Sequence, residues 1–250
     1  MELFDFFREH PRAAIAFSGG VDSAYLLYAG RMAGADVRAY YVKSAFQPEF
    51  EYTDACRLAR ELGAPLRVLT LDVLCHPEVT ANPPDRCYHC KRAIFSAIAQ
   101  AAGEDGYDLL LDGTNASDDA SDRPGMRALL ELSVRSPLRE AGLTKAEIRR
   151  RSREAGLFTW DKPAYACLAT RIPTGEGITR EKLEATERAE AFLFSLGFRD
   201  FRVRRMGDAA RLQITAGQMG LAVEQAERID TELKKYYSAV LLDLEARHEQ

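Results

Sequence analysis

Short apolar runs of strand-forming residues alternate with helical patterns along the first half of the chain. The strand-like runs are residues 13–17, 37–42, 66–71 and 109–112. Helical patterns begin near residue 22 and cover residues 49–62 and 88–101. Strands separated by helices pair in parallel, because each helix returns the chain to the same end of the sheet. We therefore predict an α/β fold with a doubly wound parallel sheet.

The second half of the chain shows a different order of elements. A helical pattern at residues 144–154 is followed by a stretch rich in Pro and Gly, residues 160–177, which is typical of a loop. Beyond it the pattern predicts a helix, two strands, a helix and a strand, at residues 180–196, 201–205, 211–215, 219–226 and 238–244. We predict two domains, residues 1–165 and a smaller α/β domain of residues 166–250.

The charge balance and the apolar runs narrow the choice of partners. The chain has 250 residues and a formal net charge of -4, without a dominant basic block. A large polyanion needs a basic surface, so we expect a small nucleotide substrate rather than a nucleic acid. No run is apolar and long enough to span a bilayer, so we expect no membrane contact and a cytoplasmic location.

Five cysteines include one close pair, Cys87 and Cys90. This usage is typical of metal or redox chemistry rather than of a disulfide framework. Cys167 lies in the expected interdomain loop, so three thiols could meet. A lone Cys-x-x-Cys leaves zinc, an iron–sulfur ligand pair, a redox dithiol and chance open, although three thiolates suit a [4Fe–4S] cluster with one open iron. Cys56 and Cys75 have no such partner, and we expect both to be buried.

The sequence SGGVDS, residues 18–23, directly follows an expected strand and opens an expected helix. Backbone N–H groups and the positive end of a helix hold phosphate in this context, and glycines allow close approach. The motif is neither the lysine-bearing loop of common nucleotidases nor the G-x-G-x-x-G fingerprint. The plainer alternative is a tight Gly-Gly connection between strand and helix.

This motif resembles the signature S-G-G-x-D-S of the PP-loop family of ATP pyrophosphatases at all five fixed positions. The resemblance implies that ATP is cleaved between its α- and β-phosphates. It also implies that Ser18, Gly19, Gly20 and Ser23 cradle the pyrophosphate, while Asp22 helps to hold Mg²⁺ as charge separates.

A second loop, residues 112–125, follows another expected strand and should face the same crevice. Its ATP-binding candidates are Gly113, Thr114, Asn115 and Arg123, and its metal-binding candidates are Asp118 and Asp119. Lys43 and Ser44, at the end of the second expected strand, are candidates for the adenosine end of ATP. The plainer alternatives are an Asx-rich turn for the loop and a solvated strand end for Lys43 and Ser44.

Several motifs extend the resemblance over nearly the whole chain. They are SGGVDS, DGTNASDD, SDRPG, RSPL, CYHCK, ACLATRIPTG and FRVRRMGDAARLQI. Their order and combination resemble the LarE family of sulfur transferases, which serves nickel-pincer nucleotide biosynthesis. The resemblance implies that ATP adenylates the carboxylates of pyridinium-3,5-biscarboxylic acid mononucleotide and that sulfur then displaces AMP, forming thiocarboxylates. It also implies a homo-oligomer.

The resemblance leaves two sulfur sources open. In the three-cysteine form of the family, Cys87, Cys90 and Cys167 hold a [4Fe–4S] cluster whose open iron carries an extra sulfide. In the single-cysteine form the residue matching Cys167 gives up its own sulfur. All three cysteines are present here, so we favour the cluster. The sequence does not indicate what reloads the sulfide.

The last third of the chain carries the substrate-binding candidates. Arg202 and Arg204 alternate with Val203, so both guanidinium groups should emerge on one face of a strand and could grip the substrate phosphate. By resemblance Glu190 matches a family acidic residue, and Arg171 is the residue we expect to orient the activated carboxylate or the nucleotide. An exposed basic strand is the plainer alternative for the two arginines.

Two further residues qualify this prediction. Gln213 stands where the family pattern usually has Glu, which weakens a metal site in the second domain, because an amide binds divalent cations less well than a carboxylate. Trp160 could stack on a pyridinium ring, although a Trp in a boundary loop is more often simply packed.

Three other functions compete with sulfur transfer to a small nucleotide. A PP-loop tRNA thiolase would need a surface for a large polyanion, which the net charge of -4 disfavours. An amide-forming PP-loop ligase would leave the cysteines without a role. A non-catalytic nucleotide sensor would bind ATP without releasing pyrophosphate.

Overall fold

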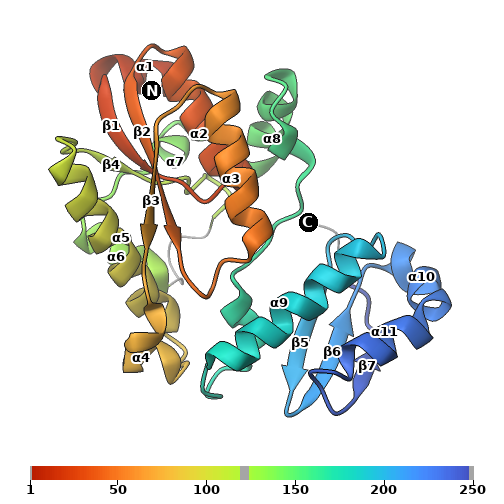
Figure 1. Cartoon of the computed structure of the whole chain (residues 1–250). Helices are drawn as coiled ribbons and strands as arrows, with labels where there is room; N and C mark the ends of the chain where they lie inside the picture. The colour runs from red at the N-terminus through yellow and green to blue at the C-terminus, as the bar shows by residue number, and fades with distance from the viewer. Residues whose placement is uncertain (1, 119–123, 248–250) are drawn as a thin grey trace. The chain divides into compact units, whose positions relative to one another are not determined.

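The computed structural model describes residues 2–118 and 124–247. It contains two compact units, which are described separately (Figure 1). The first unit comprises Met1–Val73 and Asp85–Lys162, and the second comprises Leu74–Pro84 and Pro163–Gln250.

The first unit is built on four parallel strands in the order β3-β2-β1-β4. The strands are β1 (Arg12–Ala16), β2 (Asp36–Lys43), β3 (Leu66–Thr70) and β4 (Leu110–Leu111). Its helices are α1 (Leu3–Glu9), α2 (Val21–Met32), α3 (Glu49–Glu61), α5 (Arg86–Glu104), α6 (Pro124–Glu131), α7 (Pro137–Glu140) and α8 (Lys145–Glu154), followed by the 3-10 turn η2 (Phe158–Asp161). The predicted α/β fold with a parallel sheet between helices is confirmed.

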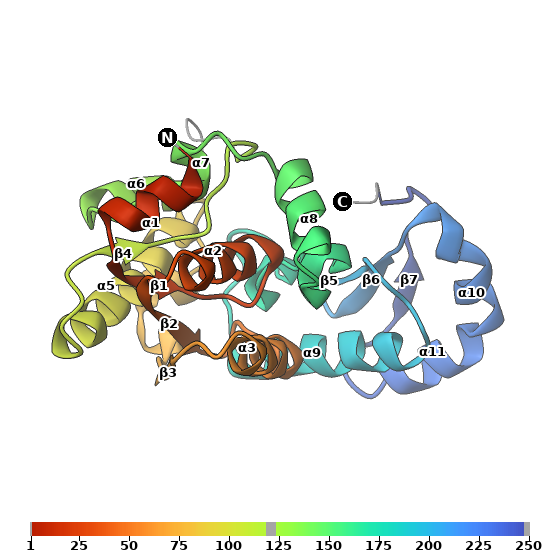
Figure 2. The same cartoon turned by 90° about the horizontal axis from the view of Figure 1, so that it is seen from above.

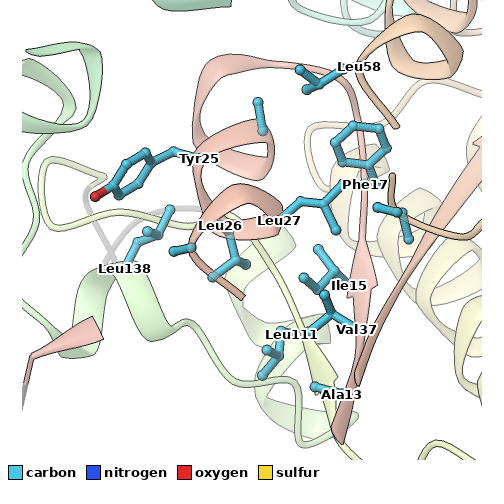
Figure 3. Packing of buried hydrophobic residues seen from close by; sticks show 14 of the residues in the cluster. Ala13, Ile15, Phe17, Tyr25, Leu26, Leu27, Val37, Leu58, Leu111 and Leu138 are labelled. Carbon is cyan, nitrogen blue, oxygen red and sulfur yellow. The ribbon is translucent and has the colours of Figure 1, made fainter. Parts of the chain in front are cut away.

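The central strand β1 of this sheet packs against helices on both faces, and this explains its almost entirely apolar sequence. Alternate residues of β1 face opposite sides: Ile15 packs in the cluster formed with α1, α2 and α3, whereas Ala14 packs in the cluster formed with α5 and α6. Figure 3 shows Ile15 and Val37 of the sheet beside Leu27 of α2. Figure 2 shows α2 and α5 on opposite sides of the strands.

The second unit has a three-stranded sheet in the order β5-β6-β7, with β5 and β6 antiparallel and β6 and β7 parallel. The strands are β5 (Arg202–Met206), β6 (Ala209–Gln213) and β7 (Val240–Leu242). Its helices are α4 (Pro77–Thr80), α9 (Arg180–Ser195), α10 (Met219–Glu224) and α11 (Ala226–Leu233), with 3-10 turns η3 (Leu168–Arg171) and η4 (Ala216–Gln218). The turn η1 (Val73–Cys75) joins the two units. α9 begins at Thr179, whose hydroxyl accepts the N–H of Lys182 at 3.3 Å.

Residues 74–84 belong to the second unit, where both the buried Asn82 side chain and backbone groups hold them. The Asn82 amide donates to the carbonyls of Pro173 at 2.8 Å and Glu176 at 3.1 Å. The backbone adds a bond from the Ile178 N–H to the Thr80 carbonyl at 2.8 Å. No periodicity in the sequence signals this long-range attachment.

The structure also departs from the sequence-based expectations locally. The short helices α1, α6, α7 and α11 were not expected. The predicted burial of Cys56 and Cys75 is wrong: Cys75 is exposed and Cys56 is half-buried. Cys75 ends a short 3-10 turn in which Val73 is the buried residue, so the turn directs the thiol outward. In the described parts of the chain, no helix combines the length and the apolar character needed to cross a membrane.

Candidate functional site

The loop between β1 and α2 is closed by hydrogen bonds between its two serines. The Ser18 N–H lies 3.3 Å and the Ser18 hydroxyl 3.1 Å from the Ser23 hydroxyl, which donates to the Gly20 carbonyl at 3.2 Å. Gly19 has a φ of 74°, and an added Cβ would lie 3.0 Å from the Cβ of Ala55. Only glycine meets both conditions without strain. The loop therefore leads directly into the amino end of α2, as the motif predicts.

Asp22, in the first turn of α2, carries an unsatisfied buried oxygen. Its Oδ2 lies 2.5 Å from the Lys145 Nζ, but its Oδ1 is buried without a hydrogen-bond partner among the described residues. Burial raises the pKa of Asp22 despite the opposing effect of Lys145. A buried carboxylate oxygen in this state is a suitable ligand for a divalent cation, because coordination satisfies it. The chemistry of this group fits Mg²⁺.

Lys145 is a site residue that the sequence analysis missed. α8 begins at Thr144, whose side chain accepts the N–H of Glu147 at 3.3 Å. This Thr-x-x-Glu pattern is a helix start, so it places Lys145 in the first turn of α8, beside Asp22. The pattern was visible in the sequence, but the pairing across the fold was not.

The loop after β4 touches the first loop through backbone atoms. A Cβ added to Gly113 would lie 2.9 Å from the Ser23 N, so only glycine fits there. Asp112 accepts hydrogen bonds from the hydroxyls of Ser136, at 2.6 Å, and Thr114. The two loops expected to share one crevice therefore lie in contact.

The rest of this second loop folds back on itself. Asn115 is buried, and its N–H donates to Asp118 Oδ2 at 3.0 Å while its own Oδ1 accepts the Ser117 N–H at 2.8 Å. This is the Asx turn considered above. Thr114 and Asp118 line the pocket described below, whereas Asn115 is not among its lining residues, so its predicted contact with ATP stays a prediction. Arg123 and Asp119 lie outside the described residues, so their predicted roles stay predictions.

Both loops line one pocket of about 330 Å³ in the first unit. Its polar wall includes Ser18, Gly20, Asp22, Ser23, Asp112, Gly113, Thr114 and Asp118, and its other walls include Tyr40, Tyr41, Val42, Ile94, Phe95 and Ile98. Lys91 and Gln47 also line it, and the sequence analysis singled out neither. A pocket with one polar end and one apolar and aromatic end suits a nucleotide.

Lys91 reaches this pocket because Gly125 makes room for it. A Cβ at Gly125 would lie 2.8 Å from the Lys91 Cδ. Lys43 and Ser44 do not line the pocket. Lys43 binds Glu49 at 3.1 Å and the Gln47 carbonyl at 2.9 Å, and Ser44 binds Gln47. Their predicted contact with ATP stays a prediction.

The cysteines are divided between the two units. Cys87 and Cys90 stand three residues apart at the start of α5, on one side of the helix, with Cys87 exposed and Cys90 half-buried. Cys167 is half-buried in the second unit and directly precedes η3. Neither unit by itself groups three His, Cys, Asp or Glu side chains as metal ligands within residues 2–118 and 124–247. The three-thiol site stays a prediction.

Arg171 and Glu190 form a buried ion pair in the second unit. Their side chains are 0% and 2% exposed, and the guanidinium binds both carboxylate oxygens, at 2.8 and 3.0 Å. Arg171 Nη1 also donates to the Ala166 carbonyl at 2.8 Å and to the Cys167 carbonyl at 3.4 Å. Glu190 accepts the Tyr165 hydroxyl at 2.5 Å and the Val203 N–H at 2.9 Å. The structure therefore brings two predicted residues together, around the turn that carries Cys167.

Arg202 and Arg204 lie on β5 on either side of Val203, which packs in the core. Arg202 is buried and donates to the Ala164 carbonyl at 2.5 Å; Arg204 donates to Gln213 Oε1 at 2.6 Å. Burial, together with the smaller effects of the neighbouring Arg171 and Arg247, lowers the pKa of Arg202 to about 10. The same causes lower the pKa of Arg204. Such mutual repulsion would be relieved by a bound anion.

Gln213 and Trp160 have ordinary structural partners. The Gln213 amide donates to Asp243 at 2.9 Å, so this side chain links Arg204 to an acid. Trp160 belongs to the first unit, and the Arg153 guanidinium lies 4.8 Å from its ring centroid. Its stacking on a substrate ring stays a prediction.

Comparison with known proteins places the chain in a family. No family model matches it. It is 38% identical over 248 residues to an uncharacterised protein of Synechocystis sp., covering 97% of this chain and 92% of that protein. It is 34% identical over 236 residues to the pyridinium-3,5-bisthiocarboxylic acid mononucleotide synthase of Lactiplantibacillus plantarum, covering 93% of this chain and 86% of that enzyme. The chain belongs to the family of this synthase.

Membership of the synthase family confirms the LarE-type resemblance drawn from the motifs. A tRNA-specific 2-thiouridylase of Pseudothermotoga lettingae is 26% identical over 201 residues, covering 66% of this chain and 57% of that enzyme. The synthase match thus spans both units, whereas the thiouridylase match leaves a third of the chain uncovered. The chain is a member of a family of sulfur-transferring enzymes within the wider PP-loop group.

Proposed function

We propose that this protein uses ATP to activate the carboxylates of pyridinium-3,5-biscarboxylic acid mononucleotide and replaces them with thiocarboxylates, for nickel-pincer nucleotide biosynthesis. The observation that supports this most is the similarity to the named synthase over 93% of the chain. The pocket of the first unit adds physical support, because its lining combines the loop at residues 18–23 with apolar and aromatic side chains.

The chemistry requires ATP because a carboxylate is a poor electrophile. The substrate carboxylate attacks the α-phosphorus, pyrophosphate leaves, and the acyl-adenylate then offers AMP as a good leaving group. In this chain Ser18, Gly20 and Ser23 would bind the pyrophosphate at the amino end of α2. Asp22 would hold Mg²⁺ through its unsatisfied Oδ1, and the ion would offset the charge that develops on the leaving group. Lys91 would add a positive charge at the same pocket.

Substrate binding is proposed for the arginines of the second unit. Arg202 and Arg204 share one face of β5 and have lowered pKa values caused by burial and by neighbouring guanidinium groups. A phosphate bound there would stabilise these charges through paired hydrogen bonds. Arg171 and Glu190, as a buried pair, would support this site by fixing the turn at Cys167.

For the sulfur source we propose a [4Fe–4S] cluster held by Cys87, Cys90 and Cys167. The donor chemistry fits, since three thiolates suit a [4Fe–4S] cluster and two of the three cysteines stand on one side of α5. When bound, the cluster would supply the sulfide that displaces AMP. The runner-up within the same reaction is Cys167 as a sacrificial donor, which would leave dehydroalanine in the chain. A homo-oligomer is proposed on the same family grounds.

The experiment is a single anaerobic turnover assay analysed by mass spectrometry. Purified protein is incubated with MgATP and the biscarboxylic nucleotide, and the masses of the nucleotide products and of the intact polypeptide are measured. We expect thiocarboxylate products together with AMP, and none from Asp22→Asn. Thiolation of bulk tRNA in place of the small nucleotide would contradict the proposal.

The same samples separate the two sulfur sources. Iron and acid-labile sulfide that are lost in Cys167→Ala would support the cluster. A polypeptide that becomes lighter by the mass of hydrogen sulfide during turnover would instead identify Cys167 as the donor. The matched control is Cys75→Ala, because Cys75 is an exposed thiol outside the proposed set.

A further inference from the structure

Gln47 is a polar residue in the lining of the pocket in the first unit. It follows β2 and lines the pocket together with Tyr40, Val42 and Phe95. The loop that carries Gln47 is held at two points: its N–H donates to the Ser44 carbonyl at 3.2 Å, and its carbonyl accepts the Lys43 Nζ at 2.9 Å. These two hydrogen bonds therefore fix the position of the Gln47 backbone.

Ser44 determines which end of the Gln47 carboxamide is available to a bound molecule. The Ser44 N–H lies 3.1 Å and the Ser44 hydroxyl 2.7 Å from Gln47 Oε1. A backbone N–H can only donate, so the atom facing it must be the oxygen and not the amide nitrogen. The hydroxyl accepts the Phe46 N–H at 3.2 Å, which leaves its own proton for Gln47. Within residues 2–118 and 124–247, Gln47 Nε2 has no hydrogen-bond partner.

We propose that Gln47 recognises the base of the bound nucleotide by donating from Nε2 to a ring nitrogen. This inference rests on the proposed function, which assigns the pocket to ATP. The phosphates take the polar wall around Ser18 and Asp22, so the base takes the walls formed by Tyr40, Val42 and Phe95. A purine offers these walls a flat apolar face and presents acceptor nitrogens at its edge. A site built to donate one hydrogen bond rejects a ligand that lacks the acceptor, because the donor then stays unpaired.

The proposal changes the role of Ser44. The sequence placed Ser44 among the ATP-binding residues, whereas its buried hydroxyl and N–H hold Gln47. Ser44 is then a positioning residue, and Gln47 makes the contact.

The experiment measures Kd by calorimetry for ATP and for three monodeaza analogues, each of which replaces one acceptor nitrogen of adenine by C–H. Gln47→Glu is the main variant, because its carboxylate can still accept both bonds from Ser44 while the Nε2 donor becomes an acceptor. Gln47→Ala removes the whole group. Gln100→Glu makes the same change on the exposed side of α5 and serves as the control. Circular dichroism melting checks that each variant is folded.

We expect both Gln47 variants to weaken ATP binding by on the order of tenfold, the value of one hydrogen bond lost against an unpaired partner. Gln100→Glu should bind ATP as the wild type does. One of the three analogues should bind the wild type about tenfold more weakly than ATP and should be insensitive to Gln47→Ala, because the two changes remove the same bond.

Two results would overturn the inference while leaving the proposed function intact. In the first, folded Gln47 variants bind ATP as tightly as the wild type. In the second, Gln47→Ala weakens ATP and all three analogues by the same factor, which would mean that Gln47 contacts the ribose or phosphates. If the wild type binds no ATP, the proposed function itself fails and the inference fails with it.

Discussion

Removing the Arg171 guanidinium should strongly destabilise the second unit. Its side chain is 0% exposed, and it makes two charged hydrogen bonds to Glu190, at 2.8 and 3.0 Å. In Arg171→Met, Glu190 keeps only the Tyr165 hydroxyl and the Val203 N–H of these partners. Breaking a buried pair on one side costs about 3–5 kcal/mol, because a charge stays buried without its counter-charge.

The assay is urea unfolding followed by circular dichroism, with the free energy of unfolding taken from the midpoint and the slope. The control is Lys234→Met, which breaks a pair with Asp230 on α11 whose side chains are 51% and 47% exposed. An exposed pair of this kind contributes less than about 1 kcal/mol. The double variant Arg171→Met with Glu190→Met should be more stable than Arg171→Met alone, since the uncompensated charge is gone. The reasoning is refuted if Arg171→Met loses no more stability than Lys234→Met.

Three further predictions concern the pocket. Burial raises the pKa of Asp22, so the native state binds its proton more readily than the unfolded state, and the free energy of unfolding falls as pH rises through the folded pKa. Asp22→Asn should therefore melt at a temperature no lower than that of the wild type at neutral pH, while forming no AMP. A lower melting temperature of the variant would contradict this. Lys91→Ala should raise the KM for ATP by about tenfold, and Lys91→Arg should raise it less. The control is Arg92→Ala, which changes an exposed residue of the same helix. If all three variants have the KM of the wild type, Lys91 does not bind ATP. Gly19 and Gly34 have φ values of 74° and 76°, but of these two only Gly19 has neighbours that an added Cβ would meet. Gly19→Ala should therefore unfold at a lower urea concentration than Gly34→Ala and lose more ATP turnover. Equal losses of stability and turnover in the two variants would show that backbone strain, and not the contact with Ala55, causes them.

The central part of the fold could be predicted because its strands alternate regularly with helices along the chain. The runs that become β1, β2 and β3 are rich in apolar and β-prone residues, and each is followed by a helical pattern of ordinary length. The short helices were missed for the opposite reason. α7 has four residues, too few to show a helical period in sequence.

Only the part of the site that lies within one short sequence motif could be predicted. The loop at residues 18–23 can be recognised in the sequence by its glycines, since the backbone geometry at Gly19 requires glycine. Lys145 and Gln47 enter the site through pairings with Asp22 and Ser44 that depend on the folded chain, and one sequence does not display them. The burial of Arg171 against Glu190 was missed likewise, because charged residues are predicted to face solvent unless a partner is known.

The most direct test of the account follows the label from ATP carrying a labelled α-phosphate. The pocket of the first unit is proposed to activate a carboxylate by releasing pyrophosphate from ATP. With the biscarboxylic nucleotide present, all released label should appear in AMP, matched by pyrophosphate, and Asp22→Asn should release none. Label recovered in ADP, or AMP formed equally well without the substrate, would contradict the account.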